Sequence, residues 1–86
     1  MVQVEPTQSN GGRAFVELIT SMLARAPDEI EVSETQDGGT TVFHVKVASD
    51  DVGRIIGREG RIIRAIRSLL RAAAVRQGGR FVLEIE

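Results

Sequence analysis

The chain has 86 residues, 42% of them hydrophobic, which is enough for one domain with a small core and leaves no room for a second. It contains no Cys and a single His, so disulfides and thiolate metal sites are excluded and no metal or other cofactor is expected. The apolar runs are too short to span a membrane, and residues 1–12 lack the pattern of a secretory signal, so we expect a cytoplasmic protein.

The formal net charge of −1 conceals an uneven distribution of charge along the chain. Residues 1–51 carry nine acidic and three basic side chains, whereas residues 52–80 carry eight arginines and one acid, Glu59. Arginine binds phosphate through its planar fork and stacks on bases, so the second segment is a candidate site for nucleic acid. The alternative is that these arginines only solvate the surface of a helix.

The first dozen residues are polar and Gly-rich and contain Pro6, which is typical of a disordered tail, so we place the domain at residues 13–86. An amphipathic helix is predicted next, because apolar residues recur at intervals of three and four until Pro27 ends the pattern. Its apolar positions are Phe15, Leu18, Ile19, Met22, Leu23 and Ala26.

Two strands joined by a tight turn follow this helix. Alternation of apolar and polar residues predicts strands at residues 29–36 and 41–48, and Asp37-Gly38-Gly39 fits a hairpin turn between them. Phe43 lies on one face of the second strand and His44 on the other, so we interpret His44 as a sheet-surface residue and not as a catalytic base.

The rest of the chain predicts two helices and a last strand. Ser49-Asp50-Asp51 is typical of a helix start, where a capping side chain precedes acids at the positive end of the helix dipole. Gly57 and Gly60 interrupt this first helix, and a second one runs from about residue 61 to residue 76. Residues 80–86 alternate again as a strand.

The order of these elements predicts an α+β fold. The two-helix crossover lets the strand at 41–48 pair in parallel with the strand at 80–86, and the hairpin places the strand at 29–36 antiparallel on the other side. We therefore predict a three-stranded mixed sheet with the helices packed on one face and the other face open.

The two glycines between the helices form the strongest functional signal. They stand in the run Ile55-Ile56-Gly57-Arg58-Glu59-Gly60-Arg61-Ile62-Ile63, with apolar pairs on both sides. Glycine lets a backbone approach another molecule closely, and the N–H groups of residues 60–62 at the start of the next helix suit a phosphate. The alternative is a tight turn between helices with solvated arginines.

This run resembles the Gly-x-x-Gly signature of KH domains, and an extra helix and strand ahead of it resemble the type II arrangement. From about residue 13 to residue 86 the chain is similar to the small stand-alone bacterial KH proteins of the KhpA family. The similarity includes Asp51-Val52-Gly53-Arg54 before the loop and Arg64-Ala65-Ile66-Arg67 after it.

The resemblance implies a protein that holds single-stranded RNA in an apolar groove, the loop clamping roughly four nucleotides. It implies that the loop residues face the sugar-phosphate backbone and that the strand at 41–48 forms the opposite wall of the groove. The implied RNA-binding residues are Gly53, Arg54, Ile56, Gly57, Arg58, Glu59, Gly60, Arg61, Ile63, Arg64 and Arg67.

Two features predict that this RNA binding is modest in affinity and low in sequence specificity. Glu59 places an acid in the loop, where it either weakens contact with phosphates or pairs with a neighbouring arginine. No aromatic residue lies near the loop in the sequence, so bases cannot stack on an aromatic ring there.

The long helix has a broad apolar arc, opposite a basic stripe of Arg64, Arg67 and Arg71. Helical periodicity predicts a core face of Ile62, Ile66, Leu69 and Ala73. Leu70 and its alanine neighbours are either part of the core or an exposed patch. The resemblance favours the patch, since it implies a homodimer, or a heterodimer with a larger KH protein, through this region. The implied interface residues are Ile66, Leu69, Leu70, Ala73 and Ala74.

Two functions follow. The first is an RNA-binding module acting as RNA chaperone or post-transcriptional regulator; the alternative is a subunit whose main role is to complete a KH–KH dimer. An enzyme is not expected, because nucleotide-binding loops need Lys-Ser or Lys-Thr after the second glycine, where this chain has Arg61-Ile62. We therefore predict no catalytic residues, no small-molecule substrate and no membrane partner.

Overall fold

The computed structural model describes residues 10–86 of the chain. Within this range the elements follow the order α-β-β-α-α-β, with short 3₁₀ turns between some of them. The helices are α1 (Asn10–Leu23), α2 (Val52–Ile56) and α3 (Arg61–Gln77), and the strands are β1 (Glu31–Asp37), β2 (Thr40–Lys46) and β3 (Arg80–Ile85).

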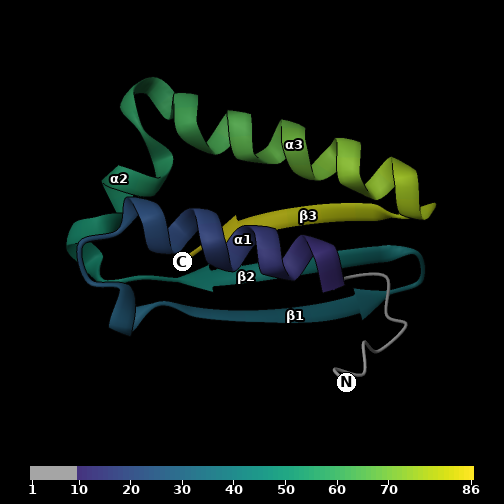
Figure 1. Cartoon of the computed structure of the whole chain (residues 1–86), viewed down its shortest axis with the longest axis horizontal. Helices are drawn as coiled ribbons and strands as arrows, with labels where there is room; N and C mark the ends of the chain where they lie inside the picture. Colours follow the sequence, from purple (N-terminus) through teal and green to yellow (C-terminus); the bar gives the residue numbers. More distant parts are fainter. Residues whose placement is uncertain (1–9) are drawn as a thin grey trace, which may run out of the picture.

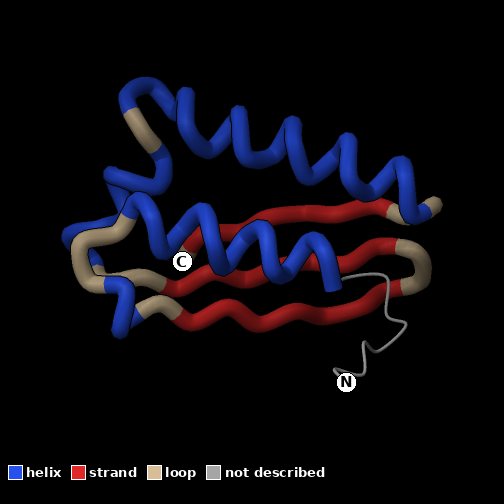
Figure 2. The backbone as a smooth tube through the Cα atoms, in the orientation of Figure 1, coloured by secondary structure: helices blue, strands red, loops and turns tan. Residues whose placement is uncertain are grey.

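The three strands form one mixed sheet in the order β1-β2-β3. β1 pairs antiparallel with β2, and β2 pairs in parallel with β3 through the two-helix crossover. Helices α1 and α3 lie side by side over the same face of the sheet (Figures 1 and 2). This arrangement confirms the predicted α+β fold, and the strand boundaries shift by only one or two residues.

The core lies between this face and the two long helices. Phe43 of β2 and Phe81 of β3 meet edge to face, with ring centroids 5.3 Å apart. Gly12 of α1 packs directly on both rings, because a Cβ atom there would lie 2.7 Å from Phe81 and 2.8 Å from Phe43. Helix α1 begins at Asn10, before the predicted domain boundary at Arg13. Because Gly12 packs on the core, residues 10–12 belong to the domain. Residues 1–9, the rest of the predicted tail, lie outside the described range.

The buried side of α1 differs from the predicted apolar face. Val16 and Thr20 are fully buried, whereas Leu18 and Met22 are 59% and 71% exposed. The Thr20 hydroxyl can be buried because it donates a hydrogen bond to the Val16 carbonyl at 2.7 Å. A polar residue thus takes a core position that apolar periodicity assigns to its neighbours.

Ser49 does not cap a helix, which corrects the prediction for that segment. Residues Ser49–Asp51 form a 3₁₀ turn, and neither it nor α2 has a side-chain cap. Asp51 is buried instead, and its two carboxylate oxygens each accept a backbone N–H, from Arg25 and from Ala26, at 3.0 Å. These two hydrogen bonds lower the pKa of Asp51 and tie the end of α1 to the start of α2.

Helix α3 is rotated relative to the predicted core face. The buried residues are Ile63, Ile66, Leu70 and Ala74. Leu69, which was predicted to face the sheet, is 57% exposed, and Ile62 and Ala73 are only partly buried. The apolar arc of α3 is wider than one sheet can cover, so periodicity alone could not decide which part of it faces the core.

On the open face of the sheet, His44 lies between side chains of the two neighbouring strands. Its Nε2 is 3.2 Å from the Thr35 hydroxyl and its Nδ1 is 3.3 Å from a carboxylate oxygen of Glu84. This confirms the predicted sheet-surface position of His44, on the face away from the helices. In the described part of the chain, no helix has the length and apolarity needed to cross a membrane.

Candidate nucleic-acid interface

The loop between α2 and α3 has a backbone that depends on its glycines. Gly57, Glu59 and Gly60 all have positive φ, of 80°, 57° and 75°. A Cβ atom on Gly57 would lie 2.6 Å from the side chain of Ile62 and 2.9 Å from its backbone nitrogen. Only glycine fits at this position, and it lets the loop turn tightly.

The loop uses two of the N–H groups that were predicted to bind phosphate. The Gly60 N–H donates to the Gly57 carbonyl at 3.0 Å, and the Arg61 N–H donates to the Arg58 carbonyl. Neither donor is free, so two of the three N–H groups predicted to face a phosphate at the start of α3 are already paired. Binding of an anion at this loop must therefore depend mainly on the arginine side chains around it.

Those side chains lie on both sides of the loop. Arg58 is exposed, and the Arg61 guanidinium lies 3.8 Å from the carboxylate of Glu59 in a solvent-exposed pair, which is weak. Arg64 donates a hydrogen bond to the Glu59 carbonyl at 2.7 Å. Arg64 therefore holds the loop from the first turn of α3, while its charge remains at the surface.

Gly53 in α2 has no packing role. It is exposed, its φ is not positive, and a Cβ atom added there would have no protein atom within 4 Å. Glycine inside a helix costs up to about 1 kcal/mol relative to alanine. Because folding does not require glycine at this position, we interpret it as space for another molecule beside the loop.

Two other residues predicted to contact RNA, Arg54 and Ile63, make contacts within the protein instead. Arg54 donates to the Asp50 carbonyl at 2.9 Å and lies 3.5 Å from the Asp51 carboxylate, so its head group contacts the start of its own helix. Ile63 is 6% exposed and belongs to the core, whereas Ile56 is only partly buried. The apolar surface next to the loop is therefore smaller than predicted.

The strand available beside α3 is β3, not β2. β2 is hydrogen-bonded to β1 on one side and to β3 on the other, so its backbone groups are already paired. β3 is the edge strand: the Arg80 N–H donates to the Gly39 carbonyl just before β2, and the Glu86 N–H donates to the Val45 carbonyl of β2. The Leu83 carbonyl accepts a hydrogen bond from the side chain of Arg67 at 3.1 Å. The predicted wall at residues 41–48 is therefore wrong.

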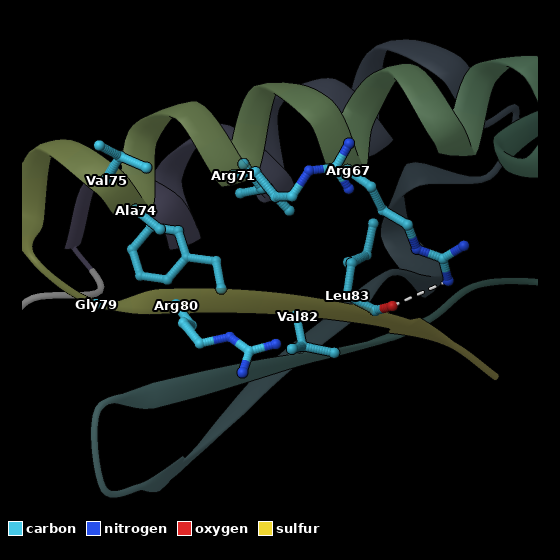
Figure 3. A pocket seen from close by; sticks show the side chains of 10 residues that line it. Arg67, Arg71, Ala74, Val75, Gly79, Arg80, Val82 and Leu83 are labelled. Atoms are coloured by element: carbon cyan, nitrogen blue, oxygen red, sulfur yellow. Dashed lines mark hydrogen bonds between the residues drawn. The ribbon is translucent and has the colours of Figure 1, made fainter.

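A cavity of about 360 Å³ opens between α3 and this edge of β3 (Figure 3). Leu70, Ala74, Phe81 and Leu83 contribute apolar lining, Arg67 and Arg71 extend from α3, and Arg80 lies at the β3 rim. Among residues 10–86, no carboxylate lies within 4 Å of the guanidinium groups of Arg64, Arg67, Arg71 or Arg80. We call Arg64, Arg67 and Arg71 of α3 the arginine row. The row and Arg80 thus carry uncompensated positive charge beside an apolar cavity.

Arg71 and Arg80 were not among the residues predicted for the site. Arg71 belongs to the predicted basic stripe, but Arg80 starts the last strand, and only the fold brings it near α3. Among the side chains that the structure describes, no cluster of three potential metal ligands occurs.

The element order, the parallel β2–β3 pair and the glycine loop between α2 and α3 define a type II KH domain. The family model described as KhpA/KhpB, KH domain matches residues 13–85, so the chain belongs to the KhpA/KhpB family of KH domains. This is a family of binding domains and not of enzymes, in agreement with the sequence analysis.

Curated relatives support this assignment. A protein named RNA-binding protein KhpA from Clostridium acetobutylicum is 41% identical over 73 residues, which are 85% of this chain and 97% of the relative. The protein of the same name from Caldanaerobacter subterraneus is 40% identical over 71 residues, 83% and 95% of the two chains. That from Chlamydia pneumoniae is 41% identical over 85% and 94%. No solved structure matches the chain significantly.

Proposed function

We propose that this protein binds single-stranded RNA along a surface formed by the glycine loop, the arginine row of α3 and the free edge of β3. The observation that carries this proposal is the set of arginines without acidic partners beside a tight loop that depends on its glycines. The relatives named RNA-binding protein KhpA support RNA as the nucleic acid.

A single strand fits this surface better than a duplex. The backbone groups at the β3 edge can hydrogen-bond only to bases whose edges are unpaired, and the cavity beside it is apolar at its base. Glu59 and the lack of an aromatic residue near the loop in the sequence argue for modest affinity and low sequence specificity. Such binding is suited to an RNA chaperone or a post-transcriptional regulator.

The test is a titration of isotope-labelled protein with a single-stranded RNA of mixed sequence, followed by NMR. We expect chemical shift changes at Gly53, in residues 57–64 and along the facing parts of α3 and β3. A duplex RNA of the same sequence should produce smaller changes. The proposal is wrong if the single strand produces no changes, or if they lie mainly on β1 and the open face of the sheet.

We also propose, as a second role, that the helical side of the domain associates with a second KH domain, either another copy or a larger partner. The interface residues implied by the resemblance need revision, because Ile66, Leu70 and Ala74 are buried in the core of this chain. Of the implied interface residues, Leu69 is exposed, and helical periodicity places it on the flank of α3 opposite Arg67.

Leu18 and Met22 add exposed apolar surface on the neighbouring α1. We call Leu18, Met22 and Leu69 the helical patch. Exposed apolar side chains on adjacent elements are typical of protein interfaces, and a domain of this size gains stability from association.

The oligomeric state of a Leu69→Asp variant tests this second role. We expect light scattering to show a dimer for the unchanged protein at high concentration and a monomer for the variant. Val75→Asp is the matched control, because Val75 is also exposed on α3 but lines the cavity instead of the helical patch. If the unchanged protein remains monomeric, or if Leu69→Asp remains dimeric, the helical patch is not the interface.

A further inference from the structure

The cavity between α3 and β3 lies well beyond the loop. About ten residues of α3 separate Arg61 from Arg71, which corresponds to roughly 15 Å along the helix axis. This is farther than one nucleotide can span. A strand whose backbone rests on the loop must therefore extend past Arg64 and Arg67 to reach the cavity.

We propose that this cavity holds a further nucleotide of the bound RNA, beyond the roughly four that a KH loop clamps. The inference rests on the proposed RNA-binding function. The volume of about 360 Å³ falls within the usual range for sites that enclose a small ligand. The base packs against the apolar lining formed by Leu70, Ala74 and Val75, and the phosphate contacts Arg71 and Arg80.

The charges around the cavity favour a nucleotide over a neutral ligand. Arg71 donates a hydrogen bond to the hydroxyl of Ser68 at 3.1 Å, and within residues 10–86 neither Arg71 nor Arg80 forms an ion pair. The Arg71 guanidinium can therefore turn towards an anion in the cavity, and Arg80 lies at the rim, with its side chain on the face of β3 away from α3 (Figure 3). The Arg67 guanidinium, bonded to the Leu83 carbonyl, lies at the edge of the cavity and marks its border with the loop side of the groove.

The test compares RNA length in the unchanged protein and in the double variant Arg71→Gln/Arg80→Gln. Oligouridines of four and of eight nucleotides are titrated by fluorescence anisotropy over a series of salt concentrations. We expect the unchanged protein to bind the longer RNA with a steeper salt dependence. The double variant should lose about 0.7 from the slope of log K against log salt for eight nucleotides, as expected for one phosphate contact, and less than this for four.

The double variant Arg25→Gln/Arg76→Gln is the control, since it removes the same charge from exposed positions outside the cavity. Three results would overturn the inference. These are equal salt slopes for both lengths in the unchanged protein, equal losses for both lengths in the cavity variant, and the same loss in the control. If the unchanged protein binds neither RNA, the proposed function itself fails, so the two failures are distinguishable.

Discussion

The guanidinium of Arg64 donates a hydrogen bond to the main-chain carbonyl of Glu59 at 2.7 Å. Glu59 has a φ of 57°, a conformation that residues with a side chain rarely adopt. The Arg64 side chain thus stabilises the loop residue with the least favourable backbone conformation, and its positive charge stays at the surface. The shape of the loop and its positive charge therefore depend on the same residue.

Replacing Arg64 should weaken RNA binding without unfolding the domain. We expect Arg64→Ala to cost about 1 kcal/mol of binding free energy, roughly fivefold in Kd, because it removes both a positioning hydrogen bond and a positive charge. Arg64→Lys keeps the charge and should lose less. Anisotropy titrations measure both, with Arg76→Ala as a control on the same helix. Equal affinities of Arg64→Ala and Arg76→Ala would show that Arg64 has no special role.

Alanine at Gly53 should separate stability from binding. A methyl group there meets no protein atom, so Gly53→Ala should stabilise the fold by about 0.5–1 kcal/mol in urea unfolding, while its RNA affinity falls. Gly11→Ala is the matched control: Gly11 is an exposed glycine in α1 whose nearest neighbour would be 3.5 Å away. It should gain similar stability and keep its affinity. Unchanged RNA binding by Gly53→Ala would contradict the assigned space beside the loop.

The acid in the loop should oppose RNA binding. Glu59→Gln is expected to raise affinity, and Glu59→Lys should also steepen the salt dependence of log K by about 0.7 through one added phosphate contact. Glu31→Gln makes the same charge change as Glu59→Gln at an exposed position on β1. The interpretation fails if Glu31→Gln raises affinity as much as Glu59→Gln does, since net charge would then explain the effect.

Acid should weaken the attachment of α1 through Asp51. The backbone hydrogen bonds from Arg25 and Ala26 hold the pKa of Asp51 below its ordinary value of 3.8. A lowered folded pKa contributes stability that is fully present above pH 3.8 and is lost as the pH falls through the folded value. Asp51→Asn should therefore have a lower Tm than the unchanged protein at pH 7, and this difference should shrink below pH 3.8. A difference in Tm that persists undiminished in acid would exclude this titration as its cause.

Element types and topology could be predicted because alternation, glycines and proline mark them locally. The rotation of each helix could not, since α1 buries the polar Thr20 and α3 has an apolar arc wider than the surface that covers it. Leu69 and Leu70 are neighbours in that arc, and only the packing of α3 against β3 decides that Leu70 is buried.

In the candidate site, the loop and most of its arginines could be identified from the motif. Three features depended on contacts distant in the sequence. The edge position of β3 follows from strand order, the role of Asp51 follows from amides about 25 residues away, and Arg80 reaches the cavity only through the crossover. The N–H groups of Gly60 and Arg61 were misjudged because the loop forms its own 3₁₀ turn.

The central claim is that the glycine loop contacts the RNA backbone. Gly60→Asp tests it most directly, because a Cβ atom there would lie 3.1 Å from the flexible end of Arg64 and 3.8 Å from Ile63, whereas one on Gly57 would strike the backbone of Ile62. Gly60 has a φ of 75°, a conformation that Asp and Asn adopt more readily than other residues with a side chain. Gly60→Asn makes a matched change without the charge, and circular dichroism confirms that both variants fold. In anisotropy titrations with single-stranded RNA, we expect Gly60→Asp to bind at least about tenfold more weakly, a loss of about 1.4 kcal/mol, and more weakly than Gly60→Asn. Binding by folded Gly60→Asp as tight as that of the unchanged protein would contradict the claim.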